Sequence, residues 1–305
     1  MSDRRLHPRA LLQGVRPKAG LEYLPSRFLK GSLALHGLAG AALVVEASAW
    51  PWALGGLALN HLAISSAGLI PRGALLGPNI VRLPEAAASA RQIALTIDDG
   101  PDPEVTPATL DILEAHGAHA TFFCVGRALL AQPALAREIV RRGHAIENHS
   151  LNHHHYFSLL GPQRMAREVR EGQRVIADIT GESSRFFRAP AGLRNPFLQP
   201  LLARNGLHLC SWTRRGFDTA CREPDRVQQR LTRGLSAGDI LLLHDGRAAR
   251  TRGGQPVILE VLPRLLKTVS AKGLSTVRLR DALPLPLPLP VAESVPESAS
   301  MSVKL

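Results

Sequence analysis

From Gln92 to about Leu283 the chain alternates short apolar runs with longer stretches of helical periodicity. Seven apolar runs predict strands, at 93–97, 120–125, 144–148, 185–189, 207–212, 239–244 and 275–279. Helical patterns lie between them, at 107–116, 133–142, 163–180, 195–205, 224–236 and 256–272. A strand, a helix and a second strand at this spacing form a parallel βαβ unit. The sequence therefore predicts an α/β domain over 91–283, either a barrel or a doubly wound sheet.

A glycine follows each helical pattern, a position that favours a left-handed helix C-cap. These glycines are Gly117, Gly143, Gly181, Gly206, Gly238 and Gly273. We therefore expect each of them to end the helix before it.

Residues 31–72 have a different composition, because Glu46 is the only charged residue between Gly31 and Pro71. A proline between two tryptophans divides them into apolar segments at about 32–49 and 53–70. Each segment has about the length that a helix needs to cross the hydrocarbon core of a bilayer. We predict an apolar helical hairpin inserted in a membrane, of the bacterial inner-membrane type. A hairpin that is buried or lies on the protein surface is the alternative.

The charges on either side of the hairpin bear on its orientation. Lys30 and Arg72 flank it, whereas the turn between its segments carries no basic residue. The positive-inside rule then favours a cytoplasmic position for both ends and for the α/β domain. A single crossing would put that domain on the outer side.

Three further segments complete the predicted organisation: a basic tail at 1–30, a linker at 73–90 and a Pro/Ser-rich disordered tail at 284–305. The formal net charge of +12 favours anionic surroundings such as phospholipid, with solvated arginines as the alternative. No nucleic-acid-binding motif is apparent and aromatic residues are scarce, so we expect no nucleic-acid partner. The three cysteines form no CxxC pair, which argues against a disulfide framework or a cysteine zinc site.

Polar residues gather just after the predicted strands, where the active sites of α/β barrels lie. Asp98 and Asp99 follow the first strand, and two adjacent carboxylates there indicate a bound metal or a shared proton, with a plain Asp-Gly turn as the alternative. His149 and His153 lie four residues apart after the third strand and can converge on one ion. Two histidines and one carboxylate form a catalytic zinc pattern, and equally a non-haem iron pattern.

Later strands are followed by further candidates. Arg188, after the fourth strand, can pair with a carboxylate and keep it ionised. Trp212 and Asp218 follow the fifth strand. His244 follows the sixth, where an imidazole can protonate a leaving group.

Four motifs together make residues 91–283 resemble the polysaccharide deacetylase family, the NodB-homology domain of carbohydrate esterase family 4. They are TIDDGP from Thr96, HSLNH from His149, RAPAG from Arg188 and LLLH ending at His244. The resemblance implies a distorted (β/α)7 barrel behind the hairpin. It also implies a hydrolase that uses a divalent metal, usually zinc, to remove an N-acetyl group from an amino sugar.

The resemblance also implies a role for each motif residue. Asp98 would be the general base, and His244 the general acid. The metal ligands would be Asp99, His149 and His153. Arg188 would orient Asp98, the backbone N–H of Ala191 would bind the oxyanion, and Pro190 and Trp212 would lie against the substrate. Asp218 matches the second acid of the family's D-x-x-D-W motif.

Two departures concern the substrate. The family usually has an aromatic residue where this chain has Ala191, and Arg215 and Thr219 replace the first acid and the tryptophan of D-x-x-D-W. A groove for a long neutral glycan is therefore in doubt. Arg214 and Arg215 would favour an anionic group such as phosphate, unless they are merely solvated.

Several functions remain open at this point. The substrate is an N-acylated glycan, such as chitooligosaccharide or peptidoglycan, or a lipid-linked amino sugar reached at the membrane. A non-catalytic carbohydrate-binding relative and a membrane scaffold are the other classes.

Overall fold

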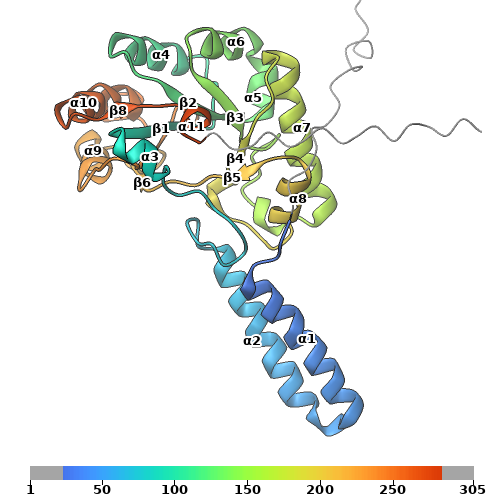
Figure 1. Cartoon of the computed structure of the whole chain (residues 1–305). Coiled ribbons are helices and arrows are strands. Elements are labelled where there is room, and N and C mark those ends of the chain that lie inside the picture. The colour runs from blue at the N-terminus through green and yellow to red at the C-terminus, as the bar shows by residue number, and fades with distance from the viewer. Residues whose placement is uncertain (1–22, 284–305) are drawn as a thin grey trace, which may run out of the picture.

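A computed structural model describes residues 23–283 of the protein, which form a curled parallel sheet with helices around it and a helical hairpin projecting from one end (Figure 1). The sheet order is β5-β4-β3-β2-β1-β7-β6, and β8 pairs with β1. The strands are β1 (Gln92–Asp98), β2 (Ala120–Cys124), β3 (Ala145–Asn148), β4 (Phe186–Phe187), β5 (His208–Leu209), β6 (Arg214–Arg215), β7 (Ile240–His244) and β8 (Ser275–Thr276). The predicted barrel class is therefore confirmed.

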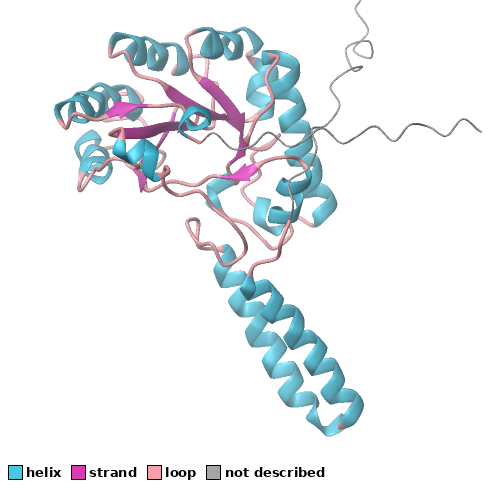
Figure 2. Cartoon of the chain, in the orientation of Figure 1, coloured by secondary structure: helices cyan, strands magenta, loops and turns pink. Residues whose placement is uncertain are grey.

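Most helices cover the outer side of the curled sheet (Figure 2), whereas the short helices α3 and α11 pack against its inner core. They are α3 (Glu85–Ser89), α4 (Thr106–Ala115), α5 (Gly126–Ala131), α6 (Pro133–Arg141), α7 (Pro162–Thr180), α8 (Leu198–Arg204), α9 (Pro224–Thr232), α10 (Val257–Ala271) and α11 (Leu279–Ala282). Five of the six predicted glycines have positive φ close behind a helix. Gly238 was misassigned, because α9 ends at Thr232 and Gly234 follows it with positive φ.

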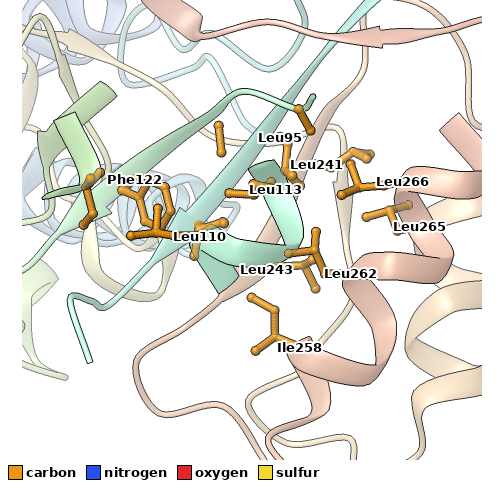
Figure 3. Close-up of a cluster of buried hydrophobic side chains, with 14 of the residues drawn as sticks. Leu95, Leu110, Leu113, Phe122, Leu241, Leu243, Ile258, Leu262, Leu265 and Leu266 are labelled. Atoms are coloured by element: carbon orange, nitrogen blue, oxygen red, sulfur yellow. The ribbon is translucent and has the colours of Figure 1, made fainter. Parts of the chain in front are cut away.

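Side chains along β1 alternate between the two faces of the sheet, as extended backbone requires. Leu95 and Ile97 belong to the outer core under the helices, whereas Thr96 and Asp98 reach Arg188 on the inner side. Figure 3 shows Leu95 beside leucines of β7, α4 and α10. Each fully buried leucine stabilises the fold by about 1.5–3 kcal/mol. This alternation places the last residue of β1 inside the barrel.

The ring of hydrogen-bonded strands is incomplete, which is the distortion of this barrel. Within residues 23–283, β5 and β6 end the pairing path and do not pair with each other. Residues 80–83, in the expected linker, lie across this gap. Ile80 N donates to Leu209 O at 2.9 Å, and Leu83 N donates to Gly238 O at 2.8 Å. The segment 73–90 is thus packed against the barrel and also contains α3.

The sheet has one strand beyond those predicted, β6, and a shorter last strand. Arg214 and Arg215 form β6 although they contain no apolar residue, so periodicity could not reveal it. Only Ser275 and Thr276 of the predicted strand 275–279 pair with β1, and α11 begins at Leu279. The disordered tail predicted at 284–305 lies outside the described residues.

The predicted helical hairpin is present as α1 (Arg27–Val45) and α2 (Trp50–Gly68). The first helix begins inside the expected basic tail, where Ser26 accepts a hydrogen bond from Leu29 N. Within the described part of the chain only α1 is long and apolar enough to cross a bilayer, with a mean hydropathy of 1.6 and 11% of that window buried. Membrane anchors and signal sequences share these properties. The second helix, α2, has the same length of 19 residues but does not reach the hydropathy of a membrane span.

Three hydrogen bonds join the end of the hairpin to the barrel. Arg194 N donates to Gly68 O at 3.1 Å, and Ser211 Oγ donates to Pro71 O at 2.7 Å. Arg72 donates to the carbonyl of Thr213 at 2.9 Å. The hairpin is therefore fixed to the loops that follow β4 and β5.

A buried ion pair joins Glu147 of β3 to Arg280 of α11, away from the hairpin. Glu147 is fully buried, accepts hydrogen bonds from two backbone N–H groups and lies 2.9 Å from Arg280. Arg280→Ala leaves this carboxylate unpaired and should lower the free energy of unfolding by about 3 kcal/mol or more, measured by urea denaturation in detergent. The deficit should shrink as the pH falls, because burial raises the pKa of Glu147 and protonation removes the buried charge.

Arg264→Ala is the matched control, because it removes an exposed ion pair with Asp225. This change should cost less than about 1 kcal/mol. Equal losses in the two variants would contradict the structural role of the buried pair.

Candidate active site

The carboxyl ends of the parallel strands meet around a cavity of about 300 Å³. Asp98 ends β1 and His244 ends β7, and these two residues are register partners. The cavity is lined by the predicted residues Asp98, Asp99, His149, His153, Ala191, Trp212 and His244. Arg188, Pro190 and Asp218 are buried and do not line the cavity themselves. The structure thus brings together side chains from distant parts of the sequence.

Asp99, His149 and His153 present ligand atoms that lie within 4.8 Å of one another. Asp99 Oδ1 is 3.2 Å from His149 Nε2 and 3.1 Å from His153 Nε2, yet this buried oxygen makes no well-aligned hydrogen bond. His149 Nδ1 donates to the carbonyl of Arg188 at 2.8 Å, which leaves a lone pair on its Nε2. Electron-rich atoms converging in this way fit a divalent cation, and the donor set suits zinc or iron.

The protonation states favour a cation at the same place. Burial alone would raise the pKa of Asp99, but His149 and His153 hold it well below its usual range. Burial and the neighbouring His149 lower the pKa of His153 to about 4. At neutral pH the group is therefore a carboxylate beside a neutral imidazole, which are the forms that bind metals.

Arg247 competes for the tautomer of His153. Its NH1 lies 3.0 Å from His153 Nδ1 and donates to it, which leaves the ring proton on Nε2. To bind an ion through Nε2, the neutral ring must carry its proton on Nδ1. That proton would then face the N–H of the Arg247 guanidinium, and the hydrogen bond would be lost. The neutral His153 ring therefore cannot accept a hydrogen bond from Arg247 through Nδ1 and bind a cation through Nε2 at the same time.

Asp98 is held by a buried arginine. Arg188 NH1 lies 2.6 Å from Asp98 Oδ1 and also donates to Thr96 Oγ1 at 2.8 Å. The other guanidinium nitrogens donate to the carbonyls of Cys210 and Ser211. Asp98 Oδ1 is thereby engaged, and its Oδ2 lies 3.8 Å from His149 Nε2 on the side of the metal ligands.

His244 is oriented by Asp218. Asp218 Oδ1 accepts from His244 Nδ1 at 2.9 Å, and Oδ2 accepts from the His244 backbone N–H at 2.7 Å. Burial alone would lower the pKa of His244, but Asp218, with Asp98 and Asp99 further away, raises it to about 8. At neutral pH the ring is therefore protonated, with its Nδ1 proton bound to Asp218.

The loops around the cavity have unusual backbone geometry. Asp99, His153, Ala191 and Arg247 line the cavity with φ between 52° and 77° although none is glycine. Such conformations cost free energy and persist only where the surroundings impose them, often at functional sites.

Some cavity residues were missed or misjudged from the sequence. His155 belongs to none of the four motifs, yet it lines the cavity with its ring 5.9 Å from that of His153. Arg247 was not singled out, although it closely follows the last motif. Arg215 lines the cavity, but Arg214 is bound to Asp239 at 2.5 Å and to two backbone carbonyls.

Comparisons with known proteins agree with the motifs. Residues 85–210 match the family described as polysaccharide deacetylase. The chain is 31% identical to the peptidoglycan-N-acetylglucosamine deacetylase of Bacillus cereus over 185 residues, 60% of this chain and 85% of that protein. It is 34% identical to the chitooligosaccharide deacetylase of Sinorhizobium fredii over 165 residues, 54% of this chain and 76% of the relative.

A solved structure adds support at the level of the fold. The family 4 carbohydrate esterase from Streptomyces lividans, solved in complex with acetate, superposes with a TM-score of 0.55 at 32% identity. The match covers 61% of this chain and 91% of that one. The motifs, the barrel and these relatives agree, and the chain belongs to the polysaccharide deacetylase family.

Proposed function

We propose that this protein is a metal-dependent hydrolase that removes the N-acetyl group from an amino sugar. The observation that carries the proposal is the meeting of three sets of residues at one cavity. These are a metal-ligand triad, an arginine-held carboxylate and an aspartate-held imidazole. The relatives named as deacetylases of peptidoglycan N-acetylglucosamine and of chitooligosaccharides support the same reaction class.

Asp99, His149 and His153 would hold the ion, which we propose to be zinc. When bound, such an ion supplies a Lewis acid and lowers the pKa of water from about 15.7 towards 7. Asp98 accepts a proton from the attacking water, and Arg188 keeps this carboxylate ionised and fixed in place. The backbone N–H of Ala191 stabilises the developing oxyanion.

His244 completes the reaction as the general acid. As the C–N bond breaks, His244 protonates the departing amine, and acetate and a free amino sugar remain. Its Nδ1 proton is bound to Asp218, so the Nε2 proton is the one available for transfer.

A non-catalytic carbohydrate-binding relative is the competing interpretation. It is disfavoured because Asp98, Asp99, His149, His153 and His244 are all present and share one cavity. Within the catalytic interpretation, a soluble glycan and a lipid-linked amino sugar are the two candidate substrates. The hairpin favours the second, because it attaches next to the site.

The first prediction separates metal binding from catalysis. His149→Ala should lose the metal and the activity together, measured by metal analysis and acetate release. Asp98→Asn should keep the metal while kcat falls by about 100-fold or more, since general-base catalysis contributes about that much. His116→Ala, a change at an exposed helix end, should affect neither measurement. A wild-type protein that binds stoichiometric zinc but releases no acyl group from any amino sugar would support the binding interpretation instead.

The second prediction concerns pH. His244 acts while protonated, and its pKa is raised to about 8, so activity should fall as the pH rises through about 8. In Asp218→Asn the charge that raises this pKa is gone while the burial that lowers it remains. The alkaline limb of the kcat/KM profile should therefore move to lower pH, with kcat reduced about 100-fold or more. Asp225→Asn, at a largely exposed surface position, should leave the limb in place. A limb that stays unchanged in Asp218→Asn would refute the assignment of His244.

The third prediction concerns localisation, for which we propose membrane anchoring through α1. Leu38 on this helix is 69% exposed, and an aspartate in the bilayer centre costs about 2.5–3.5 kcal/mol. Leu38→Asp should therefore lower the membrane-bound fraction after cell fractionation. Leu130→Asp changes a leucine that is 58% exposed on α5 and serves as the control. Equal partitioning of both variants would count against the anchor, and a C-terminal reporter fusion determines sidedness.

A further inference from the structure

Arg215 faces the candidate active site without an acidic partner. Its guanidinium lies 5.3 Å from the ring centroid of Trp212 and 4.9 Å from that of Phe217. Among residues 23–283 no carboxylate lies within ion-pair distance of it, and its buried Nε donates no hydrogen bond. The adjacent Arg214 has all three guanidinium nitrogens engaged. The structure therefore satisfies one arginine of β6 and holds the other ready for a ligand.

The position of Arg215 is rigid. β6 pairs with β7, and Arg215 is the register partner of Leu242, which also lines the cavity. The guanidinium lies within cation–π distance of the rings of both Trp212 and Phe217, which restricts its position. An arginine fixed in this way suits bidentate recognition of a phosphate or a carboxylate.

Arg247 adds a second positive charge to the same cavity. Arg247 is exposed and lines the cavity. Its hydrogen bond to His153 Nδ1 is lost when an ion binds to His153 Nε2. Arg188, by contrast, is neutralised by Asp98 and buried. Two guanidinium groups in this cavity thus remain uncompensated once the triad holds its ion.

Arg215 and the reacting residues line one compact cavity. Its volume of about 300 Å³ is at the lower end for ligand pockets, enough for about one substituted sugar ring. Arg215 shares this space with Asp98 and His244. An anionic group bound by Arg215 would therefore lie near the acylamino group, on the same sugar or on its linking oxygen.

The attachment of the hairpin bears on the source of that anion. Pro71 accepts from Ser211 Oγ, and Arg72 donates to Thr213 O, on either side of Trp212 in the sequence. A side chain at Gly192, which lines the cavity, would collide with both Pro71 and Trp212. An anchored α1–α2 hairpin therefore holds the rim of the cavity close to the membrane surface.

From these observations we infer that the cavity selects an acylamino sugar bearing a phosphate or carboxylate group, and that Arg215 is the residue that recognises this anion. The inference rests on the proposed deacetylase function and specifies its substrate class. Loss of a hydrogen-bonded charge partner costs about 1.5–3 kcal/mol, or roughly 10- to 150-fold in affinity. We expect the affinities of a charged and a neutral sugar at this site to differ by a similar factor.

The test compares three substrates on the zinc-loaded full chain in detergent. They are a polyprenyl-phosphate-linked N-acetylglucosamine, soluble N-acetylglucosamine 1-phosphate and neutral N,N′-diacetylchitobiose. Wild type should favour at least one anionic substrate over the neutral one in kcat/KM. Arg215→Gln should lower this preference about tenfold or more. Arg230→Gln is the matched control, because Arg230 also stacks on Phe217 but lies outside the cavity lining.

Three outcomes are decisive. A preference for the lipid-linked substrate supports the inference and identifies a glycolipid as the source of the anion. A preference for the soluble phosphate supports it with a free sugar phosphate as the source. A wild-type preference for the neutral sugar, or an equal loss on all three substrates in Arg215→Gln, overturns it.

A binding measurement keeps the inference separate from the catalytic proposal. Titration calorimetry with N-acetylglucosamine 1-phosphate and with N-acetylglucosamine is made on Asp98→Asn, alone and combined with Arg215→Gln. If wild type shows no turnover but Arg215→Gln selectively weakens the phosphate ligand, deacetylation fails while the anion site holds. If the two sugars bind alike with and without Arg215, the anion site fails.

Discussion

The buried contact between Arg188 and Asp98 organises the rest of this site. A buried guanidinium loses its hydration, at an effective cost of several kcal/mol, and is stable only when its donors are used. Arg188 meets this condition with Thr96, Asp98 and two backbone carbonyls, and its guanidinium lies 4.0 Å from the ring centroid of Phe123. Its own carbonyl accepts from His149 and selects the tautomer of that ring. A single residue therefore fixes both the carboxylate of β1 and one of the metal ligands.

Arg188 also connects the active site to the hairpin, through Ser211. Ser211 accepts from Arg188 through its carbonyl and donates through its hydroxyl to Pro71. The next residue, Trp212, lines the cavity and supports Arg215. A displacement at the end of α2 would thus reach the cavity wall through two hydrogen bonds. Such a short connection, of which the bond at Arg188 is fully buried, favours a fixed orientation between hairpin and barrel.

Much of the barrel could be predicted from the sequence, because long apolar strands and glycine-terminated helices carry a local signal. The period-2 pattern of β1 places Asp98 inside, and the motifs identify the residues at the ends of β3, β4 and β7. β6 could not be predicted, because Arg214 and Arg215 become a strand only by pairing with β7. Nor could Arg247, since its place at the cavity depends on how the loop after β7 folds back toward His153.

The acidic residues in and beside the cavity have different pKa values because their surroundings differ. Asp99 lies among imidazoles, which hold its pKa low, whereas burial raises the pKa of Asp245 to about 7 despite bonds from Thr106 and Gly246. Asp245 therefore carries only part of a charge near neutral pH, which reduces repulsion with Asp99. His244, with its pKa raised to about 8, stays protonated in the same range. Groups whose pKa values are pushed apart in this way can divide the roles of ligand, base and acid. The two remaining arginines then give the cavity its positive excess, because no acid in the described chain neutralises Arg215.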